Sequence, residues 1–172
     1  MENKAISVKQ VPPDKGHYIA GFVDGEGSFY VSARKRDDYR SKWRMTAHFN
    51  VSNNDHKVLE ICKKYLGCGI IRQSRLGFYT LEVENLNTLN NFIIPFFRRF
   101  GFLSNKKTKE FSTFRKIVAL IEAPIQTKAQ LQLFFSLRKE LNTLRKGGRA
   151  TNTDAVILQS FIFHEESSET IR

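Results

Sequence analysis

Residues 43–52 alternate between apolar and polar side chains at every step, and this pattern constrains the fold more than any other feature of the sequence. The apolar set is Trp43, Met45, Ala47, Phe49 and Val51, and the polar set is Arg44, Thr46, His48, Asn50 and Ser52. Successive side chains of a strand point to opposite faces, so the segment predicts a β-strand with one buried and one solvated face. Residues 28–36 alternate in the same way and predict a second strand.

The segments around these two strands predict helices and a hairpin. Pro12 and Pro13 suit the start of a helix and Gly25 suits its end, so we expect a helix over about residues 14–24. The runs 69–75 and 78–83 predict a β-hairpin. Apolar residues at helical spacing predict further helices between 55 and 67 and over 86–97, 106–122, 127–144 and 153–163.

The predicted order α-β-β-α-β-β-α, followed by more helices, indicates an α+β fold. We expect a four-stranded antiparallel sheet with helices on one face and polar side chains on the other. The chain has 172 residues, which suits one domain over residues 1–172. Within it we expect a core over about 14–122 and a C-terminal helical extension over about 127–163.

The charge balance predicts a polyanionic partner. The sequence has 28 Lys and Arg against 17 Asp and Glu, a formal net charge of +11. Nucleic acid, an anionic membrane surface and an acidic protein all fit this charge, because net charge informs about association and not about fold. No apolar run approaches the length that crosses a bilayer, and residues 1–16 show no secretory signal, so we expect a protein that is neither inserted in a membrane nor secreted.

The polar face of the predicted sheet is a candidate nucleic-acid interface, since Arg, Asn, Ser and Thr read base edges and hold phosphates. An ordinary solvated face is the alternative. The candidate DNA-binding residues on the sheet are Tyr30, Ser32, Arg34, Arg36, Arg44, Thr46, His48, Asn50, Arg72, Ser74 and Thr80. Arg145, Lys146 and Arg149 surround a glycine pair after a helix and are expected to hold phosphates.

The segment Ile19-Ala20-Gly21-Phe22-Val23-Asp24-Gly25-Glu26-Gly27 carries the candidate chemistry. Gly21 and Gly25 lie four residues apart on one helical stripe, which lets a second helix approach closely. Glu26 follows the last turn, beside unpaired carbonyls at the negative end of the helix dipole, where a cation is favoured. A helix that stops at glycine, with solvated acids, is the alternative interpretation of these residues.

This segment closely resembles the signature nonapeptide of the LAGLIDADG homing endonucleases. Residues 28–31, 49–53, 66–69 and 106–111 also resemble the family pattern, so the resemblance covers nearly the whole chain. It implies the αββαββα homing-endonuclease fold with a saddle-shaped sheet. A single motif in 172 residues resembles the homodimeric branch, which is familiar from group I introns.

The resemblance also implies an activity: a site-specific cut of double-stranded DNA at a long pseudo-palindromic site, leaving short 3′ overhangs. An intron RNA maturase or a non-cleaving DNA-binding protein on the same scaffold is the alternative. The gene is expected in a chloroplast or mitochondrion, with a bacterial cytoplasm as the other option. The expected partners are double-stranded DNA and a second copy of the chain, with no nucleotide cofactor and no membrane.

The resemblance also implies roles for individual residues. Glu26, with the Gly25 carbonyl, is expected to bind Mg²⁺ or another divalent cation such as Mn²⁺. Asn53 stands where the family commonly has a Gln that positions the attacking water, and Lys106 matches a basic residue near the active-site solvent. The expected dimer interface consists of Ala20, Gly21, Asp24 and Gly25.

Overall fold

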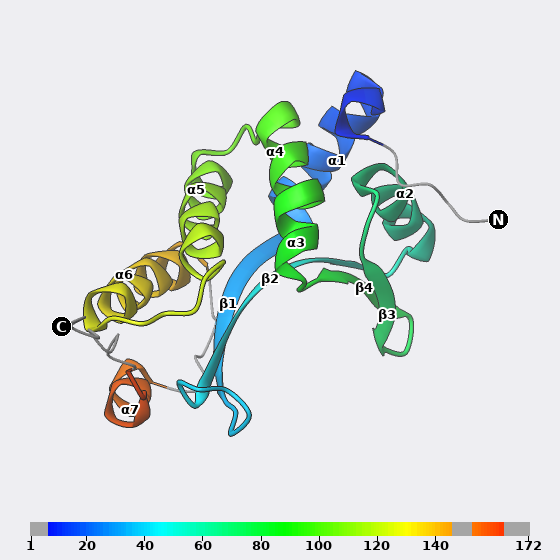
Figure 1. The fold of residues 1–172 in the computed structure, drawn as a ribbon. Helices are drawn as coiled ribbons and strands as arrows, with labels where there is room; N and C mark the ends of the chain where they lie inside the picture. Colours follow the sequence, from blue (N-terminus) through cyan, green and yellow to red (C-terminus); the bar gives the residue numbers. More distant parts are fainter. Residues whose placement is uncertain (1–6, 146–152, 164–172) are drawn as a thin grey trace.

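The structure is a computed structural model that describes residues 7–145 and 153–163 (Figure 1). The first half contains a 3-10 turn η1 (Val8–Gln10), α1 (Pro13–Glu26), β1 (Gly27–Lys35), β2 (Trp43–Asn53), α2 (His56–Leu66), β3 (Ile70–Arg75) and β4 (Phe78–Val83). The second half contains α3 (Leu86–Thr88), η2 (Leu89–Ile93), α4 (Ile94–Phe100), α5 (Asn105–Leu120), α6 (Lys128–Leu144) and α7 (Asp154–Ser160). This order confirms the predicted α+β fold.

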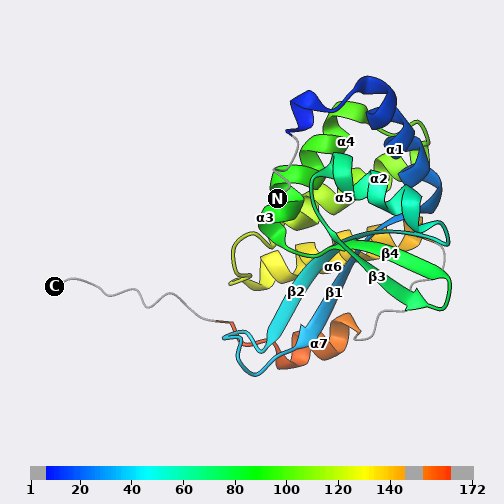
Figure 2. The same ribbon diagram turned by 90° about the vertical axis from the view of Figure 1, so that its right-hand side faces the viewer.

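The four strands form one antiparallel sheet in the order β1-β2-β4-β3. β2 pairs with β1 from Trp43 to Val51 but with β4 only from Phe49 to Asn53, so β2 extends well beyond β4. Helices α1 to α5 cover one side of the sheet, and α7 lies beside the far ends of β1 and β2 (Figure 2). The opposite side of the sheet carries the predicted polar face.

The core lies between the sheet and these helices, and phenylalanines dominate it. The Phe29 ring of β1 lies within 6.0 Å, between ring centroids, of five other phenylalanine rings. These partners are Phe49, Phe97, Phe102, Phe111 and Phe114. Gly16 lets α1 approach α4, because a Cβ there would lie 2.2 Å from a ring carbon of Phe100. Tilted and edge-to-face ring pairs of this kind add to the free energy gained by burial.

The region predicted as one helix over 86–97 is a helix with an interruption. The η2 segment is a π-helical stretch between α3 and α4, and the N–H of Ile94 bonds the carbonyl of Leu89 five residues back. Pro95 follows at the start of α4. A proline has no N–H to donate, so the regular helical ladder has to be interrupted near this point.

The C-terminal helices pack against the rest of the chain in two places. Phe134, Leu137 and Leu141 of α6 join the main core. A second cluster at the far end of the sheet contains Ala33, Trp43, Leu131, Ile157 and Phe161. The indole N–H of Trp43 donates to the Ser160 hydroxyl at 3.0 Å, which fixes α7 to the start of β2.

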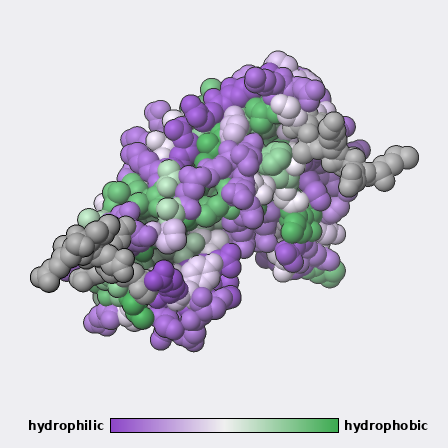
Figure 3. All heavy atoms as spheres, in the orientation of Figure 1, coloured by the Kyte–Doolittle hydropathy of each residue, from purple (hydrophilic) through white to green (hydrophobic). Residues whose placement is uncertain are grey.

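The face of the molecule shown in Figure 3 is mainly hydrophilic, with smaller apolar patches among the polar residues. Within residues 7–145 and 153–163, no helix combines the length and apolar character of a membrane span.

Candidate active site and nucleic-acid interface

The chain passes from α1 into β1 without a loop, and Glu26 is the last residue of the helix. The Glu26 side chain is exposed, whereas Gly27 is buried, and a Cβ at Gly27 would lie 2.4 Å from a methyl group of Val23. The last carbonyls of a helix lack intrahelical partners. The junction therefore presents an exposed carboxylate beside main-chain oxygens.

Asp24, the other acid of the motif, is used inside the chain. Its carboxylate accepts hydrogen bonds from the backbone N–H of Ser104, at 3.0 Å, and from the Ser104 hydroxyl. Ser104 is in turn the N-cap of α5, and its hydroxyl accepts from the N–H of Lys107. An acid at a helix N-terminus is favoured by the helix dipole. Asp24 thus fastens α5 to α1, and Glu26 is the motif carboxylate left available to a ligand.

Two lysines at the start of α5 lie in different environments. The Nζ atom of Lys107 is buried and lies 2.7 Å from both the Gly27 carbonyl and the Glu110 carboxylate. Lys106, which the sequence predicted as the functional lysine, is exposed, and its Nζ is 3.8 Å from Glu110. Sequence reasoning missed Lys107. Its signal was the spacing of Lys107 and Glu110 on α5, three residues apart and therefore on one helical face.

Asn53 lies at the same end of the sheet as Glu26. Gly27 pairs with Val51, and β2 continues past this pair to Asn53. The side-chain oxygen Oδ1 of Asn53 accepts a hydrogen bond from the backbone N–H of Asp55 at 2.9 Å, which leaves the side-chain NH₂ group of Asn53 as a donor to a ligand. The fold thus gathers Glu26, Asn53 and the two lysines around the α1–β1 junction.

The polar face of the sheet places two arginines directly opposite each other. Arg34 of β1 pairs with Arg44 of β2, and both side chains are exposed. Like charges at opposed positions destabilise a sheet, and an anion between them removes this cost. Ser32 lies opposite Thr46, and Asn50 lies opposite Glu82, so hydrogen-bonding side chains continue along the face.

A stack of three side chains stands on this face. The rings of Tyr30 and His48 are parallel, with centroids 4.3 Å apart, and the Arg145 guanidinium lies 5.0 Å from the Tyr30 centroid. Burial lowers the pKa of Arg145 and raises the pKa of Tyr30. Burial also lowers the pKa of His48, although Glu84 acts in the opposite direction. Arg145 follows α6, so the C-terminal extension contributes to the predicted interface.

Several candidates on this face differ from the simple expectation of exposed side chains. His48 and Thr80 have the predicted register but are buried by their neighbours, because His48 stacks on Tyr30 and Thr80 bonds the Ser52 hydroxyl at 2.8 Å. Both residues thus offer little surface in this structure, and their contact with DNA stays a prediction. Ser74 donates to the Phe78 carbonyl at 3.1 Å, in the β3–β4 hairpin.

Arginines outside the centre of the face are paired with acids. Arg36 lies beyond the end of β1 and makes two 2.9 Å contacts with Asp38, which lower the pKa of that carboxyl to about 2. The Arg72 guanidinium is 3.5 Å from Glu82. Lys146 and Arg149 lie outside the described residues. Arg34 and Arg44 are therefore the arginines of this interface best placed for an incoming anion.

One face of α1 is open. A Cβ at Gly21 or Gly25 would meet no atom within 4 Å, so packing inside the chain does not require glycine at either position. The exposed Tyr18 ring is parallel to the ring of Phe22 on the same side of the helix. Ala20 is buried in the core of its own chain, and its predicted place in an interface stays a prediction.

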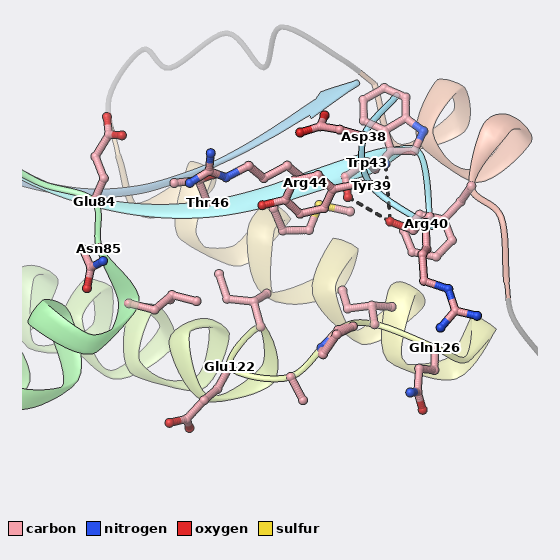
Figure 4. Close-up of a pocket in the computed structure, with 18 of the residues that line it drawn as sticks. Asp38, Tyr39, Arg40, Trp43, Arg44, Thr46, Glu84, Asn85, Glu122 and Gln126 are labelled. Carbon is pink, nitrogen blue, oxygen red and sulfur yellow. Dashed lines mark hydrogen bonds between the residues drawn. The ribbon is translucent and has the colours of Figure 1, made fainter. Parts of the chain in front are cut away.

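A cavity of about 600 Å³ lies where β2 extends beyond β4 (Figure 4). Its lining comes from the β1–β2 turn, β2, residues 84–87 and the α5–α6 connection. Arg40 and Arg44 line it together with Glu84 and Glu122, so both signs of charge are present. The lining does not define one ligand chemistry.

The described residues hold no group of three or more His, Cys, Asp or Glu side chains arranged for a metal ion. The oxygen donors at the α1–β1 junction are the exposed Glu26 carboxylate and the nearby main-chain carbonyls. Carboxylates, carbonyls and water are the ligands of Mg²⁺ and similar hard cations, so these donors fit part of such a site.

Comparisons with known proteins agree with this architecture. The model of the LAGLIDADG endonuclease family matches residues 19–118. The homing endonuclease I-ApeII of Aeropyrum pernix is 32% identical over 105 residues, covering 59% of this chain and 60% of that protein. The DNA endonuclease I-CeuI of Chlamydomonas moewusii is 28% identical over 121 residues, covering 67% of this chain and 56% of that protein. The chain thus spans less than two thirds of either relative.

Solved structures extend the likeness to most of the chain. The archaeal intron-encoded homing endonuclease I-Vdi141I, complexed with DNA, has a TM-score of 0.76 and 28% identity, covering 85% of this chain and 93% of that chain. I-SmaMI, bound to uncleaved DNA target in the presence of calcium ions, has a TM-score of 0.72 and 26% identity, covering 86% of this chain and 49% of that chain. This chain belongs to the LAGLIDADG endonuclease family, as the motif at residues 19–27 predicted.

Proposed function

We propose that two copies of this chain form a site-specific endonuclease that cuts double-stranded DNA with a divalent cation. One observation carries the proposal. The exposed Glu26, at the end of α1, lies at one end of the sheet, and Arg34 and Arg44 lie opposite each other on the polar face of the same sheet. A pure binding surface does not need a carboxylate there, because a carboxylate repels phosphate unless a cation lies between them. I-Vdi141I is complexed with DNA and I-SmaMI is bound to an uncleaved DNA target, which supports DNA as the partner of this chain.

The open face of α1 supports the pairing of two copies. Gly21 and Gly25 allow backbone contact between two helices, and Tyr18 and Phe22 add apolar area beside them. The chain covers 49% of I-SmaMI, so that protein has room for a second unit of this size, in agreement with a pair of copies. Ala20 and Asp24 act within the protomer, so Gly21 and Gly25 form the proposed contact.

The sheet sets the length of the target. β2 has 11 residues and spans about 36 Å at about 3.3 Å per residue, which equals about ten base pairs at about 3.4 Å each. Two copies related by a two-fold axis would read a pseudo-palindrome of about twenty base pairs. Arg34 and Arg44 suit guanine, and Asn50 suits adenine.

At the cutting site, side chains and carbonyl groups of this chain would bind the cation and orient the water and the phosphate. Glu26 and the Gly25 carbonyl would hold a divalent cation, for which Mg²⁺ is the proposed physiological ion. Such an ion activates water and stabilises the charge that develops on phosphate oxygens. The Asn53 NH₂ group would orient a water molecule by donating a hydrogen bond to it. Lys107 fixes the junction by bonding the Gly27 carbonyl, and Lys106 offers a positive charge to the phosphate.

The gene is proposed to lie in an intron. I-Vdi141I is described as intron-encoded, and a protein in ND4 intron 1 of Podospora anserina is 30% identical over 112 residues. The match covers 24% of the length of the Podospora anserina protein. A chloroplast or mitochondrial location stays a prediction.

A cleavage assay with a matched control tests the proposed function. The protein is first used to select bound sequences from randomised DNA, and the selected duplex is then incubated with the protein and Mg²⁺. We expect double-strand cuts with the parent, none with Glu26→Gln, and parent-like cutting with Glu60→Gln, an exposed carboxylate on α2. Sequence-specific binding without any cut by the parent would identify a binding protein instead.

A further inference from the structure

Three side chains on the polar face form a hydrogen-bonded series that the cutting chemistry does not use. The Ser32 hydroxyl oxygen lies 2.8 Å from Nε2 of His48, and Nδ1 of His48 lies 3.1 Å from a carboxylate oxygen of Glu84. Ser32 comes from β1, His48 comes from β2, and Glu84 follows β4. Residues far apart in the sequence thus converge on the surface proposed to meet DNA.

The series fixes the direction of each proton. A carboxylate only accepts hydrogen bonds, so Nδ1 of His48 carries the proton that faces Glu84. A neutral imidazole has one N–H, and Nε2 is then an acceptor. The Ser32 O–H therefore donates to Nε2, which leaves the Ser32 oxygen with lone pairs and no proton to offer outward.

The surroundings of His48 keep this arrangement in place. His48 is 4% exposed, and its imidazole lies parallel to the Tyr30 ring, over which the Arg145 guanidinium lies. The charged groups that act on it are Glu84, Arg34 and Arg44. Burial and the two arginines disfavour a second proton on the ring, and Glu84 favours it, with burial the largest effect.

We propose that Glu84 and His48 act as positioning residues that make the Ser32 hydroxyl a hydrogen-bond acceptor towards the DNA base it faces. In the major groove, the amino groups of adenine N6 and cytosine N4 are donors, whereas guanine O6 and N7 and thymine O4 are acceptors. The series therefore selects a base that carries an amino group at one position in each half-site. This inference rests on the proposed function and specifies its base recognition.

The first arm of the test compares base preferences at every position of the selected site, for the parent and two variants. Ser32→Ala removes the acceptor. Glu84→Ala removes the group that fixes the His48 proton on Nδ1, so that Nε2 can carry the proton and the Ser32 O–H can donate outward. Both are expected to reduce the preference for an amino-bearing base about tenfold at the same base pair.

Glu82→Ala is the matched control, because Glu82 is a carboxylate on the same face that lies 3.5 Å from the Arg72 guanidinium and makes no hydrogen bond with His48. Removing either carboxylate is expected to raise the affinity for all DNA sequences, because a negative charge near phosphates is lost. Of these two carboxylate variants, Glu84→Ala is expected to change the base preference at the Ser32 position and Glu82→Ala is expected to keep it.

The second arm reads the proton on His48 in the DNA-free protein, from the ¹⁵N chemical shifts of its ring at pH 7.5. A protonated Nδ1 and an unprotonated Nε2 are expected in the parent. The opposite tautomer would overturn the inference, as would a Glu84→Ala variant that keeps the parent's base preference. A parent that selects no DNA sequence would overturn the proposed function and this inference together, whereas the two preceding outcomes overturn this inference alone.

Discussion

Replacing Lys107 with methionine tests how strongly the buried pair on α5 stabilises the active-site junction. The Lys107 and Glu110 side chains are 8% and 2% exposed, and their charged atoms are 2.7 Å apart. Removal of one partner from a buried pair leaves an uncompensated charge, at a cost of about 3–5 kcal/mol. For a protein of this size we therefore expect Lys107→Met to lower the melting temperature by roughly 10 °C.

The double variant Lys107→Met/Glu110→Met separates the cost of an unpaired buried charge from the cost of losing the hydrogen bond between Lys107 and the Gly27 carbonyl. It removes both charges, so about half of the lost stability should be recovered. What remains is the Gly27 carbonyl without its donor, which costs about 1–3 kcal/mol.

Urea unfolding at pH 7 measures these differences at one fixed protein concentration, because the stability of an assembling chain depends on concentration. Lys106→Met is the control: Lys106 is exposed and 3.8 Å from the same acid, so its loss should cost less than about 1 kcal/mol. A Lys107→Met variant no less stable than Lys106→Met would refute the reasoning.

Three further predictions concern the dimer, acid stability and DNA contact. Gly21→Leu should leave the protomer folded, because a Cβ at this position meets no atom of its own chain within 4 Å. The larger side chain should block the proposed contact between two α1 helices and shift the protein from two copies to one in analytical ultracentrifugation. The lowered pKa of His48 means that the unfolded chain binds its proton more readily, so stability is lost as the pH falls through about 6.5; His48→Gln should flatten the dependence of the unfolding free energy on pH between 7.5 and 5. Arg34→Gln should raise the stability of the free protein by about 0.2–1 kcal/mol and lower its DNA affinity in a binding titration, and a loss of stability would contradict the repulsion between Arg34 and Arg44.

Local patterns in the sequence predicted the elements and the faces of the sheet. The alternation in residues 43–52 gave the strand β2 and its inward Phe49 and Val51 correctly, because the two-residue period of a strand is a local property. The glycines of the motif likewise marked the open face of α1. The π-helical stretch before Pro95 was not predicted, since apolar spacing alone does not distinguish it from a regular helix.

The partners of several site residues could not be predicted from the sequence, because these partners come from distant segments of the chain. Lys106 and Lys107 are neighbours, and only the packing of α5 against β1 determines which of them is buried beside Gly27. The bond between Asp24 and Ser104 joins residues 80 positions apart, and the one between His48 and Glu84 spans 36. Both bonds depend on how helices and strands pack in three dimensions. The spacing of apolar residues along the sequence does not predict this packing.

A crystal structure of the protein with its selected duplex and Ca²⁺ tests the central claim most directly. We predict two protomers on one duplex, touching at Gly21 and Gly25 of α1, with both Glu26 carboxylates beside cations at the phosphates to be cut. A single protomer on the DNA, or an α1 that faces solvent in the complex, would contradict the account.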